Sequence, residues 1–288
     1  AMFDKIAPSG VIVATPNNHH FEPTVAALNL GCHVLVEKPI MATLDEAEQV
    51  CAMSEATARH VLVGHHRRYY PQIEKARELI QSGALGRLVA VSGMWCVRKP
   101  DSYYGPEFRQ LVSSGPVMTN LIHEIDYLCY ICGPIVSVQA ETNNHVQGFA
   151  KEDVASLVIK FASGALGAFV LSDQGDSPWA WEFGSGENPA FPKSGQNSIR
   201  FVGTKGALDF PNLCLWSGPV GEENWNGVKS PTQFPLDYGD AYLRQIDHFG
   251  DVISGAATPL VSARDATETL RTTLSVLQAA ATGTRVVL

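Results

Sequence analysis

The sequence predicts an α/β region with a parallel sheet at residues 1–66, followed at 67–288 by an α+β region. The first region alternates short apolar runs with helical segments, a rhythm that favours parallel strands joined by right-handed crossovers. The second is rich in strand-like segments separated by turn residues, which is typical of a large, mostly antiparallel open sheet covered by helices. A chain of 288 residues, 45% apolar and 17% charged, is long enough to bury such cores.

Three short apolar runs in the first region are the predicted parallel strands. Because the run at 11–14 is continuously apolar, we expect that strand to be buried on both faces of the sheet. Of the two helical patterns, the first is followed by Gly31 and the second begins with a capping box from Thr43 to Glu46. The other two predicted strands are 34–36 and 61–63.

In the second region, Pro71 is a favoured first-turn residue for a helix, and Gly83 is a favoured residue for its end. Further helices are predicted at 117–131 and near 241–253 and 263–281. The strand-like segments are 88–97, 136–141, 155–161, 165–172, 199–202 and 207–210, with hairpin turns at 163–164 and 203–206.

The composition excludes several classes of partner. The net charge is −8 and no basic run exceeds two residues, so nucleic acid and anionic membranes are poor partners. No apolar stretch reaches the roughly 18 residues of a membrane-spanning helix, and the chain does not begin with a signal peptide pattern. The six cysteines lack disulfide-scaffold spacing, so we expect reduced thiols and a cytoplasmic protein.

Polar side chains gather where the three predicted strands end, at 15–17, 37–39 and 64–68. Ligands of an open parallel sheet bind at this edge. Lys38 is the sharpest candidate, because it lies between a buried strand and Pro39, which restricts the backbone. Partial burial would lower the pKa of its ammonium group, and Glu37 would orient it for proton transfer. A lysine that extends to the surface is the alternative.

The predicted helix at 117–131 has two separate faces. His123 lies on the polar face, four residues after Thr119 and three before Asp126, which suits a general base held by its neighbours. A solvated face is the alternative, although tyrosines are uncommon on one. The apolar face carries Met118, Leu121, Ile122, Ile125, Leu128, Cys129 and Cys132, and the polar face carries Thr119, His123, Asp126, Tyr127 and Tyr130.

Two further features have weaker functional interpretations. Cys129 and Cys132 have metal or redox spacing, but they lie in an apolar helix without a second pair, so core packing is favoured and no metal site is predicted. An aromatic loop at 177–188 contains Trp181 and Glu187, which would suit the wall of a site for a polyhydroxylated substrate. A large loop that packs its own tryptophans is the equal alternative.

A series of motifs runs along most of the chain: Val11-Ile-Val-Ala-Thr-Pro-Asn17, Gly31-x-His-Val-Leu-Val-Glu-Lys-Pro39, Gly64-His-His-Arg-Arg-Tyr-Tyr-Pro71, Gly83-Ala-Leu-Gly86 and Asn120-Leu-Ile-His-Glu-Ile-Asp126. Together they resemble the Gfo/Idh/MocA family, named for glucose–fructose oxidoreductase, inositol dehydrogenase and rhizopine catabolism. Glu-Lys-Pro after a strand, combined with His-x-x-Asp downstream, is the most specific part.

The resemblance implies hydride transfer between NAD or NADP and an alcohol carbon of a sugar, cyclitol or dihydrodiol. Lys38 would hold the reacting oxygen and relay its proton, and His123 would act as general acid and base. Asn120 and Thr119 would complete the catalytic group, and Lys38, Asn120, His123, Trp181 and Glu187 would contact substrate. The cofactor would be lined by Thr15, Pro16, Asn17, His20, Glu37, Lys38 and Arg68.

Two departures from the family pattern modify this expectation. Thr119 stands where many members carry an aspartate, so Asn120 is the candidate polar partner of His123. The chain contains no Gly-x-Gly-x-x-Gly turn, which normally holds the cofactor pyrophosphate on backbone N–H groups. Ala1 precedes Met2, which is typical of a residue left by a tag before an initiator methionine. We therefore expect a truncated Rossmann-like domain that binds NAD or NADP weakly or not at all.

The sequence therefore predicts an oxidoreductase-family protein with a small polyhydroxylated substrate. We expect a homodimer or homotetramer that associates through the sheet of the second region or through an uncovered sheet edge. One alternative is a non-catalytic sugar-binding or assembly remnant. The other is a cofactor-independent lyase or epimerase that uses Lys38 and His123 as an acid/base pair. The dehydrogenase interpretation requires these two residues to converge on one pocket between the two regions.

Overall fold

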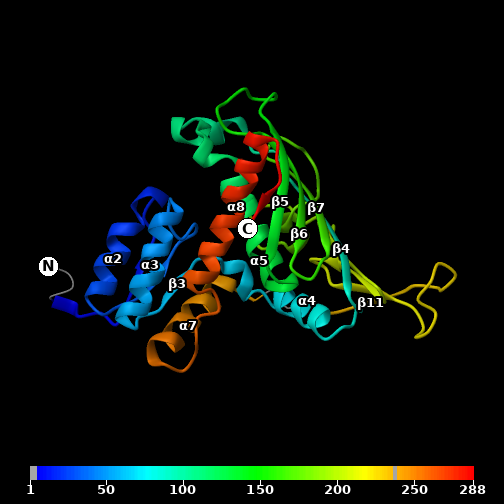
Figure 1. Ribbon diagram of the computed structural model, residues 1–288, viewed down its shortest axis with the longest axis horizontal. Coiled ribbons are helices and arrows are strands. Elements are labelled where there is room, and N and C mark those ends of the chain that lie inside the picture. Colours follow the sequence, from blue (N-terminus) through cyan, green and yellow to red (C-terminus); the bar gives the residue numbers. More distant parts are fainter. Residues whose placement is uncertain (1–4, 236–238) are drawn as a thin grey trace. The chain divides into compact units, whose positions relative to one another are not determined.

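The computed structural model describes residues 5–235 and 239–288, which form two compact units (Figure 1). Unit 1 comprises Ala1–Tyr69 and Asp240–Arg271, and unit 2 comprises Tyr70–Gly239 and Thr272–Leu288. The segment Asp240–Arg271 therefore packs with the first 69 residues, although it is far from them in the sequence.

Unit 1 is built on a parallel sheet of three strands in the order β1-β2-β3, as predicted. The second crossover begins where the sequence indicates, because Thr43 and Glu46 form both hydrogen bonds of a capping box. The elements are β1 (Gly10–Val13), η1 (Asn17–His19), α2 (Phe21–Asn29), β2 (His33–Val36), α3 (Leu44–Thr57), β3 (Val61–Val63) and η2 (His66–Tyr69).

Helix α7 (Ala241–Ser254) covers one face of this sheet. Its Phe249 and Val252 form a buried cluster with Leu35 and Leu62, which lie side by side on β2 and β3. The segment before α8 (Ala263–Thr282) joins the edge of β3, where the Val63 N–H donates to the carbonyl of Val261. Burial of these apolar side chains stabilises the unit by about 1.5–3 kcal/mol for each.

The prediction that the first strand is buried on both faces is wrong. Ile12 lies beside Leu35 in the parallel register but is 54% exposed. The reason is its position: β1 is the edge strand of the described three-stranded sheet, and α7 packs close to it at Gly10, where an added Cβ would clash with Ile253. A continuous apolar run therefore does not prove that a strand is covered twice.

Unit 2 contains a nine-stranded sheet in the order β11-β10-β9-β8-β4-β7-β6-β5-β12. Only β4 and β7 pair in parallel, which confirms the mostly antiparallel sheet. Strands β10, β11 and β12 are absent from the sequence prediction because they are short and lack apolar alternation. The strands are β4 (Leu88–Cys96), β5 (Ile135–Asn143), β6 (Val154–Phe161), β7 (Leu166–Ser172), β8 (Ile199–Gly203), β9 (Gly206–Phe210), β10 (Cys214–Ser217), β11 (Ser230–Gln233) and β12 (Val286–Val287).

One face of the large sheet carries the core of unit 2. Along β6 the buried residues Leu157 and Ile159 flank the exposed Val158, which is the alternation of a sheet covered on one side. Helix α4 (Pro71–Gln81) packs against α5 (Ile122–Cys132) (Figure 1). The Tyr127 ring of α5 contacts the Phe210 ring of β9. The α5 helix therefore covers the buried face.

The predicted helix at 117–131 begins with a π-helical turn, η6 (Val117–Leu121), before α5. Its supposed polar face is not solvated: His123 is 9% exposed, and Asp126 and Tyr127 are fully buried. Tyr127 belongs to an aromatic cluster with Trp181 and Phe210, so its place on a polar face was wrong. Cys129 and Cys132, which were expected in the core, are partly exposed. Tertiary packing, not the periodicity of the helix, decides these positions.

Candidate functional site

The first half of the candidate site lies at the carboxyl ends of the parallel strands in unit 1. The Glu37 N–H donates to the carbonyl of Val13, and the Gly64 N–H donates to that of Val36, so the sheet ladder extends into the loops. This pairing brings the predicted segments 15–17, 37–39 and 64–68 to one edge of the sheet. Thr15, Pro16 and Asn17 are exposed there, whereas Glu37 and Lys38 are half-buried.

Glu37 lies directly against Gly64. A Cβ at Gly64 would stand 2.7 Å from Glu37 Oε2 and 3.1 Å from the Glu37 Cα atom. The same carboxylate oxygen accepts a hydrogen bond of 3.3 Å from the backbone N–H of Lys38. Glycine at position 64 therefore leaves the space in which the Glu37 carboxylate sits beside Lys38.

His20 connects the first two of these loops. Its ring is fully buried, with Nδ1 2.9 Å from the Pro39 carbonyl oxygen and Nε2 2.9 Å from the Thr15 carbonyl oxygen. The Thr15 hydroxyl in turn donates to the carbonyl of His19 at 2.8 Å. His20 is thus placed to hold the backbone on both sides of the edge, and its contact with a cofactor stays a prediction.

Arg68 and His66 are tied to other parts of unit 1. The buried Arg68 guanidinium donates to the carbonyl of Leu260 at 3.2 Å and lies 4.0 Å from Asp265 Oδ2. The ring of His66 stacks on Tyr242 of α7, with centroids 4.5 Å apart. These contacts fix η2 against α7 and the start of α8, and a role for Arg68 beside a cofactor stays a prediction.

The second half of the site lies in unit 2, around Asn120. Its side-chain oxygen Oδ1 accepts hydrogen bonds of 2.9 Å from both Lys99 Nζ and the Thr119 hydroxyl. The Thr119 hydroxyl is also within 3.0 Å of the Gly115 carbonyl, one turn earlier in the chain. Three predicted residues, Thr119, Asn120 and His123, therefore share the π-helical turn and the first turn of α5. A π-helical turn is often found at a functional site.

Lys99 is the residue of this half that the sequence analysis missed. Its ammonium group lies 4.8 Å from the centroid of the Tyr103 ring and 3.8 Å from Asp173 Oδ2. Burial lowers the pKa of Lys99 to about 8, against the opposing effect of the Asp173 carboxylate. No sequence motif marks Lys99, because its partners lie 21 and 74 positions away.

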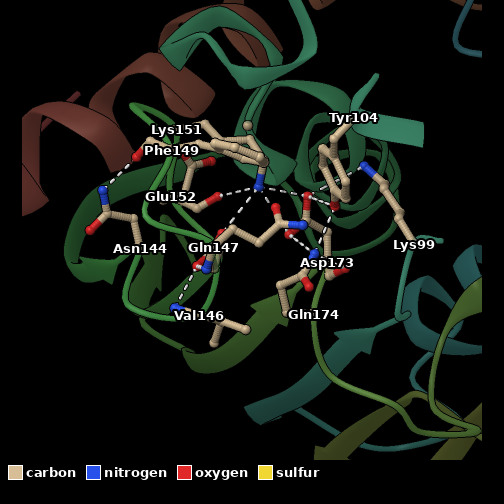
Figure 2. A network of polar contacts seen from close by, with 12 residues as sticks. Lys99, Tyr104, Asn144, Val146, Gln147, Phe149, Lys151, Glu152, Asp173 and Gln174 are labelled. Atoms are coloured by element: carbon tan, nitrogen blue, oxygen red, sulfur yellow. Dashed lines mark hydrogen bonds and ion pairs between the residues drawn. The ribbon is translucent and has the colours of Figure 1, made fainter. Parts of the chain in front are cut away.

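A buried polar network around Asp173 also holds Lys99. Lys151 is fully buried, and its ammonium group lies 3.0 Å from Asp173 Oδ2 and 3.3 Å from Asp153 Oδ1. The Tyr104 hydroxyl donates to Asp173 at 2.8 Å. Figure 2 shows Lys151 and Lys99 approaching Asp173 from opposite sides. Burial, together with the Asp173 contact, raises the pKa of Tyr104, so Tyr104 acts as a hydrogen-bond donor.

Trp181 and Glu187 form one contact in unit 2. Trp181 begins the short helix α6 (Trp181–Ser185) and is fully buried against Tyr70 and Phe210. Its indole N–H donates to Glu187 Oε2. Trp181 is thus packed against rings from outside its own loop, and the substrate contact expected for both residues stays a prediction.

The described residues, 5–235 and 239–288, contain neither a candidate metal site nor a membrane-spanning helix. Within these ranges no cluster of three or more His, Cys, Asp or Glu residues is placed to bind a metal ion. All six cysteines are free thiols. No helix in the same ranges combines the length and apolar character needed to span a membrane.

Two family models match the chain. Residues 1–65 match the model described as "Oxidoreductase family, NAD-binding Rossmann fold". Residues 73–209 match the model of the "GFO/IDH/MocA C-terminal domain", so the two domains of one family follow each other in the expected order. The chain belongs to the Gfo/Idh/MocA family of oxidoreductases.

Individual relatives of this Gfo/Idh/MocA protein agree with that assignment. It is similar to 1,5-anhydro-D-fructose reductase of Ensifer adhaerens, with 28% identity over 278 residues that cover 95% of this chain and 78% of the relative. It is also similar to scyllo-inositol 2-dehydrogenase (NAD(+)) of Bacillus subtilis, with 24% identity over 263 residues that cover 89% and 71% of the two chains.

A solved structure confirms the fold class. The chain superposes with a TM-score of 0.75 on the WlbA dehydrogenase of Chromobacterium violaceum, crystallised with NADH and UDP-GlcNAcA. Identity is 21%, and the match covers 100% of this chain and 81% of that one. At this level of identity the likeness concerns the fold alone.

The family assignment leaves the two halves of the site as separate findings. Lys38 belongs to unit 1, whereas Thr119, Asn120 and His123 belong to unit 2. The predicted convergence of Lys38 and His123 on one pocket therefore stays a prediction. What the structure brings together is Lys38 with Glu37 in one unit, and Asn120 with Thr119 and Lys99 in the other.

Proposed function

We propose that this protein is an NAD(P)-dependent dehydrogenase or reductase acting on an alcohol carbon of a small sugar, cyclitol or dihydrodiol. The observation that carries the proposal is the Glu37-Lys38-Pro39 segment, which follows β2, the middle strand of the parallel sheet, within the part that matches the NAD-binding family model. Relatives named for reduction of an anhydro-fructose and for dehydrogenation of an inositol support a polyhydroxylated substrate.

The residues at the edge of unit 1 fit the ribose and nicotinamide part of such a cofactor. Thr15, Pro16 and Asn17 offer exposed polar groups at the end of β1. Gly64 leaves room for the Glu37 carboxylate, because a Cβ there would stand 2.7 Å from Glu37 Oε2. Carboxylate and hydroxyl groups are suitable partners for ribose hydroxyls. We propose residues 1–66, with the segment Asp240–Arg271 that packs on them, as part of the dinucleotide-binding domain. The rest of 67–288 is the proposed substrate and oligomerisation domain.

The proposed reaction divides proton handling between two residues. The nicotinamide, when bound, supplies or accepts the hydride. The Lys38 ammonium group holds the reacting oxygen and relays its proton, and the His123 ring takes or returns that proton as general base or acid. Asn120 contacts the substrate from the turn that precedes His123.

Turnover of a polyol panel tests this function. The chain is incubated with each polyol, with and without NAD+ or NADP+, and absorbance is followed at the nicotinamide band. Reduction of the cofactor supports the proposal. Product formed without nucleotide would instead support a lyase or epimerase, and thermal stabilisation by a polyol without any turnover would support a binding module.

Variants of the two proton-handling residues sharpen the test. We expect Lys38→Met and His123→Ala each to lower kcat by at least about a hundredfold, which is the usual contribution of a positioned acid or base. Lys160→Met and His145→Ala, which alter exposed residues, serve as matched controls and retain activity. Activity that survives in both site variants would contradict the assigned roles.

The proposal includes weak binding of the cofactor. It rests on the absence from this sequence of a Gly-x-Gly-x-x-Gly turn, whose backbone N–H groups would bind the pyrophosphate. A titration that follows NADH fluorescence is expected to give a dissociation constant far above the micromolar range. A micromolar value would contradict weak binding while leaving the assignment of the reaction intact.

Association and location complete the proposal. The open face of the large sheet exposes Val158 and Leu166, each 54% exposed, and Val202, a surface that a second copy would cover in a homodimer or homotetramer. We expect light scattering to show a dimer or tetramer, and Val158→Lys to shift it towards monomer. The six free thiols suit a reducing compartment such as the cytoplasm.

A further inference from the structure

The orientation of the Asn120 carboxamide is decided by Lys99. An ammonium group has hydrogen-bond donors and no acceptor, so the atom of Asn120 that lies 2.9 Å from Lys99 Nζ must be the oxygen. The Thr119 hydroxyl, 2.9 Å from the same oxygen, is compatible with this assignment. The two N–H donors of Asn120 Nδ2 are therefore directed away from Lys99.

These donors remain available. Within residues 5–235 and 239–288, Asn120 makes no hydrogen bond through Nδ2, and Nδ2 is not among the buried polar atoms that lack a partner. Asn120 lies in the π-helical turn, three residues before His123, and is partly exposed. An oxygen atom of a ligand is the natural acceptor for such a group.

Lys99 is itself held in place. Its side chain is 11% exposed, and its ammonium group lies 5.8 Å from the Trp95 ring centroid and 4.8 Å from that of Tyr103. Asp173 lies between Lys99 and Lys151 (Figure 2). Asp173 cannot follow a movement of Lys99, because Lys151 and Tyr104 already bind its carboxylate.

We propose that Lys99 is a positioning residue that locks Asn120 with its N–H donors towards the substrate, so that Asn120 binds an acceptor oxygen of a polyhydroxylated ligand. The proposal rests on the proposed function, in which Asn120 contacts the substrate. It explains how the neutral Asn120 can bind a substrate in one orientation. The Lys99 ammonium group favours the orientation of the carboxamide in which Oδ1, and not Nδ2, faces it.

The protonation state of Lys99 controls the orientation of the Asn120 carboxamide. Burial lowers the pKa of Lys99 to about 8. The carboxylates of Asp173, Glu182 and Glu152 act in the opposite direction, and Lys151 acts in the same direction as burial. Above this pH the neutral amine accepts as well as donates hydrogen bonds, so it no longer selects the oxygen of Asn120.

Nuclear magnetic resonance of the full chain labelled with nitrogen-15 tests whether Lys99 orients the Asn120 carboxamide, and this test needs no turnover. The side-chain amide signal of Asn120 is assigned by its absence in Asn120→Asp. We expect this signal to shift with a midpoint near pH 8 in the wild type. It should not shift over the same range in Lys99→Arg, whose guanidinium stays charged. A wild-type signal that does not move between about pH 7 and about pH 9 would overturn the inference.

Kinetics with the best polyol then test the consequence for the reaction. We expect Lys99→Met to lower kcat/KM by about tenfold, and Asn120→Asp to do the same because a carboxylate has no N–H donor. Lys99→Arg should keep most of the activity and lose the fall in activity above pH 8. Lys160→Met is the control for loss of a surface lysine.

The outcomes are distinguishable. Wild-type kinetics in Lys99→Met would overturn the positioning role, and so would a decline at basic pH that is unchanged in Lys99→Arg. If no polyol is turned over by the wild type, the proposed function fails. The amide titration still decides in that case whether Lys99 orients Asn120.

Discussion

The ring nitrogen Nδ1 of His20 lies 2.9 Å from the carbonyl oxygen of Pro39, although the two residues follow neighbouring strands and are 19 positions apart. Its other nitrogen faces the backbone of Thr15 at the same distance. A fully buried imidazole thus bridges two loops that carry most of the predicted cofactor residues. The geometry of Lys38 depends on this bridge, because Lys38 directly precedes Pro39.

Replacing His20 should cost both stability and cofactor affinity. His20→Phe replaces the imidazole by an apolar ring and leaves the buried Pro39 carbonyl without its partner. We expect the free energy of unfolding to fall by about 1–3 kcal/mol. His19→Phe, at the exposed neighbouring position, is the control. Urea unfolding and the NADH titration measure the two effects, and equal stability of both variants would contradict a bridging role.

A pair of glycine substitutions tests the packing at Glu37. Gly64→Ala places a Cβ 2.7 Å from Glu37 Oε2 and 3.1 Å from its Cα, so Glu37 and the Lys38 loop must move. We expect weaker NADH binding and a loss of stability of about 1–3 kcal/mol. Gly250→Ala, in α7 with open space around it, should instead stabilise by about 0.5–1 kcal/mol. Similar behaviour of the two variants would count against the Glu37 contact.

The buried Lys151 should be the most costly lysine to remove from unit 2. Lys151→Met leaves Asp173 and Asp153 without their ammonium partner, and breaking such a buried pair costs about 3–5 kcal/mol. Adding Asp173→Asn should recover part of the loss, since it removes one of the orphaned charges. Lys160→Met, on the exposed side of β6, is the control in the same unfolding assay. An additive double variant would argue against direct coupling.

Glu152 should make stability depend on pH. Burial raises the pKa of its carboxyl group above the ordinary 4.5, while the Val117 N–H works in the opposite direction. Above pH 4.5 the carboxyl group therefore stays protonated to a higher pH in the native state than in the unfolded chain. Its contribution to the free energy of unfolding then falls as pH rises towards the native pKa.

Glu152→Gln removes this titration. We expect its stability relative to the wild type to improve from about pH 4.5 upwards and to level off above the native pKa. Glu141→Gln, on the exposed side of β5, is the control. Urea unfolding at several pH values provides the measurement. A difference that is constant with pH, or that grows as pH falls, would contradict the direction of the pKa shift.

Local pattern was sufficient for most of the fold. The Thr43 capping box, the parallel strands and six strands of the large sheet follow from periods of two and 3.6 residues, which depend on neighbouring positions only. Sequence reasoning failed where burial depends on a distant element. Ile12 is exposed because α7, more than 200 residues later, does not cover it, and Tyr127 is buried because Trp181 and Phe210 pack on it.

The sequence by itself determined the family and the fold class. It also placed Glu37-Lys38-Pro39 at the end of a parallel strand, because motifs and alternation are properties of consecutive residues. Only the tertiary structure decided which side chains hold one another: His20 on Pro39, Glu37 against Gly64, and Lys99 on Asn120. The reason is physical, since these contacts join residues 19 to 27 positions apart, and their hydrogen bonds and packing form only after the strands and helices have assembled.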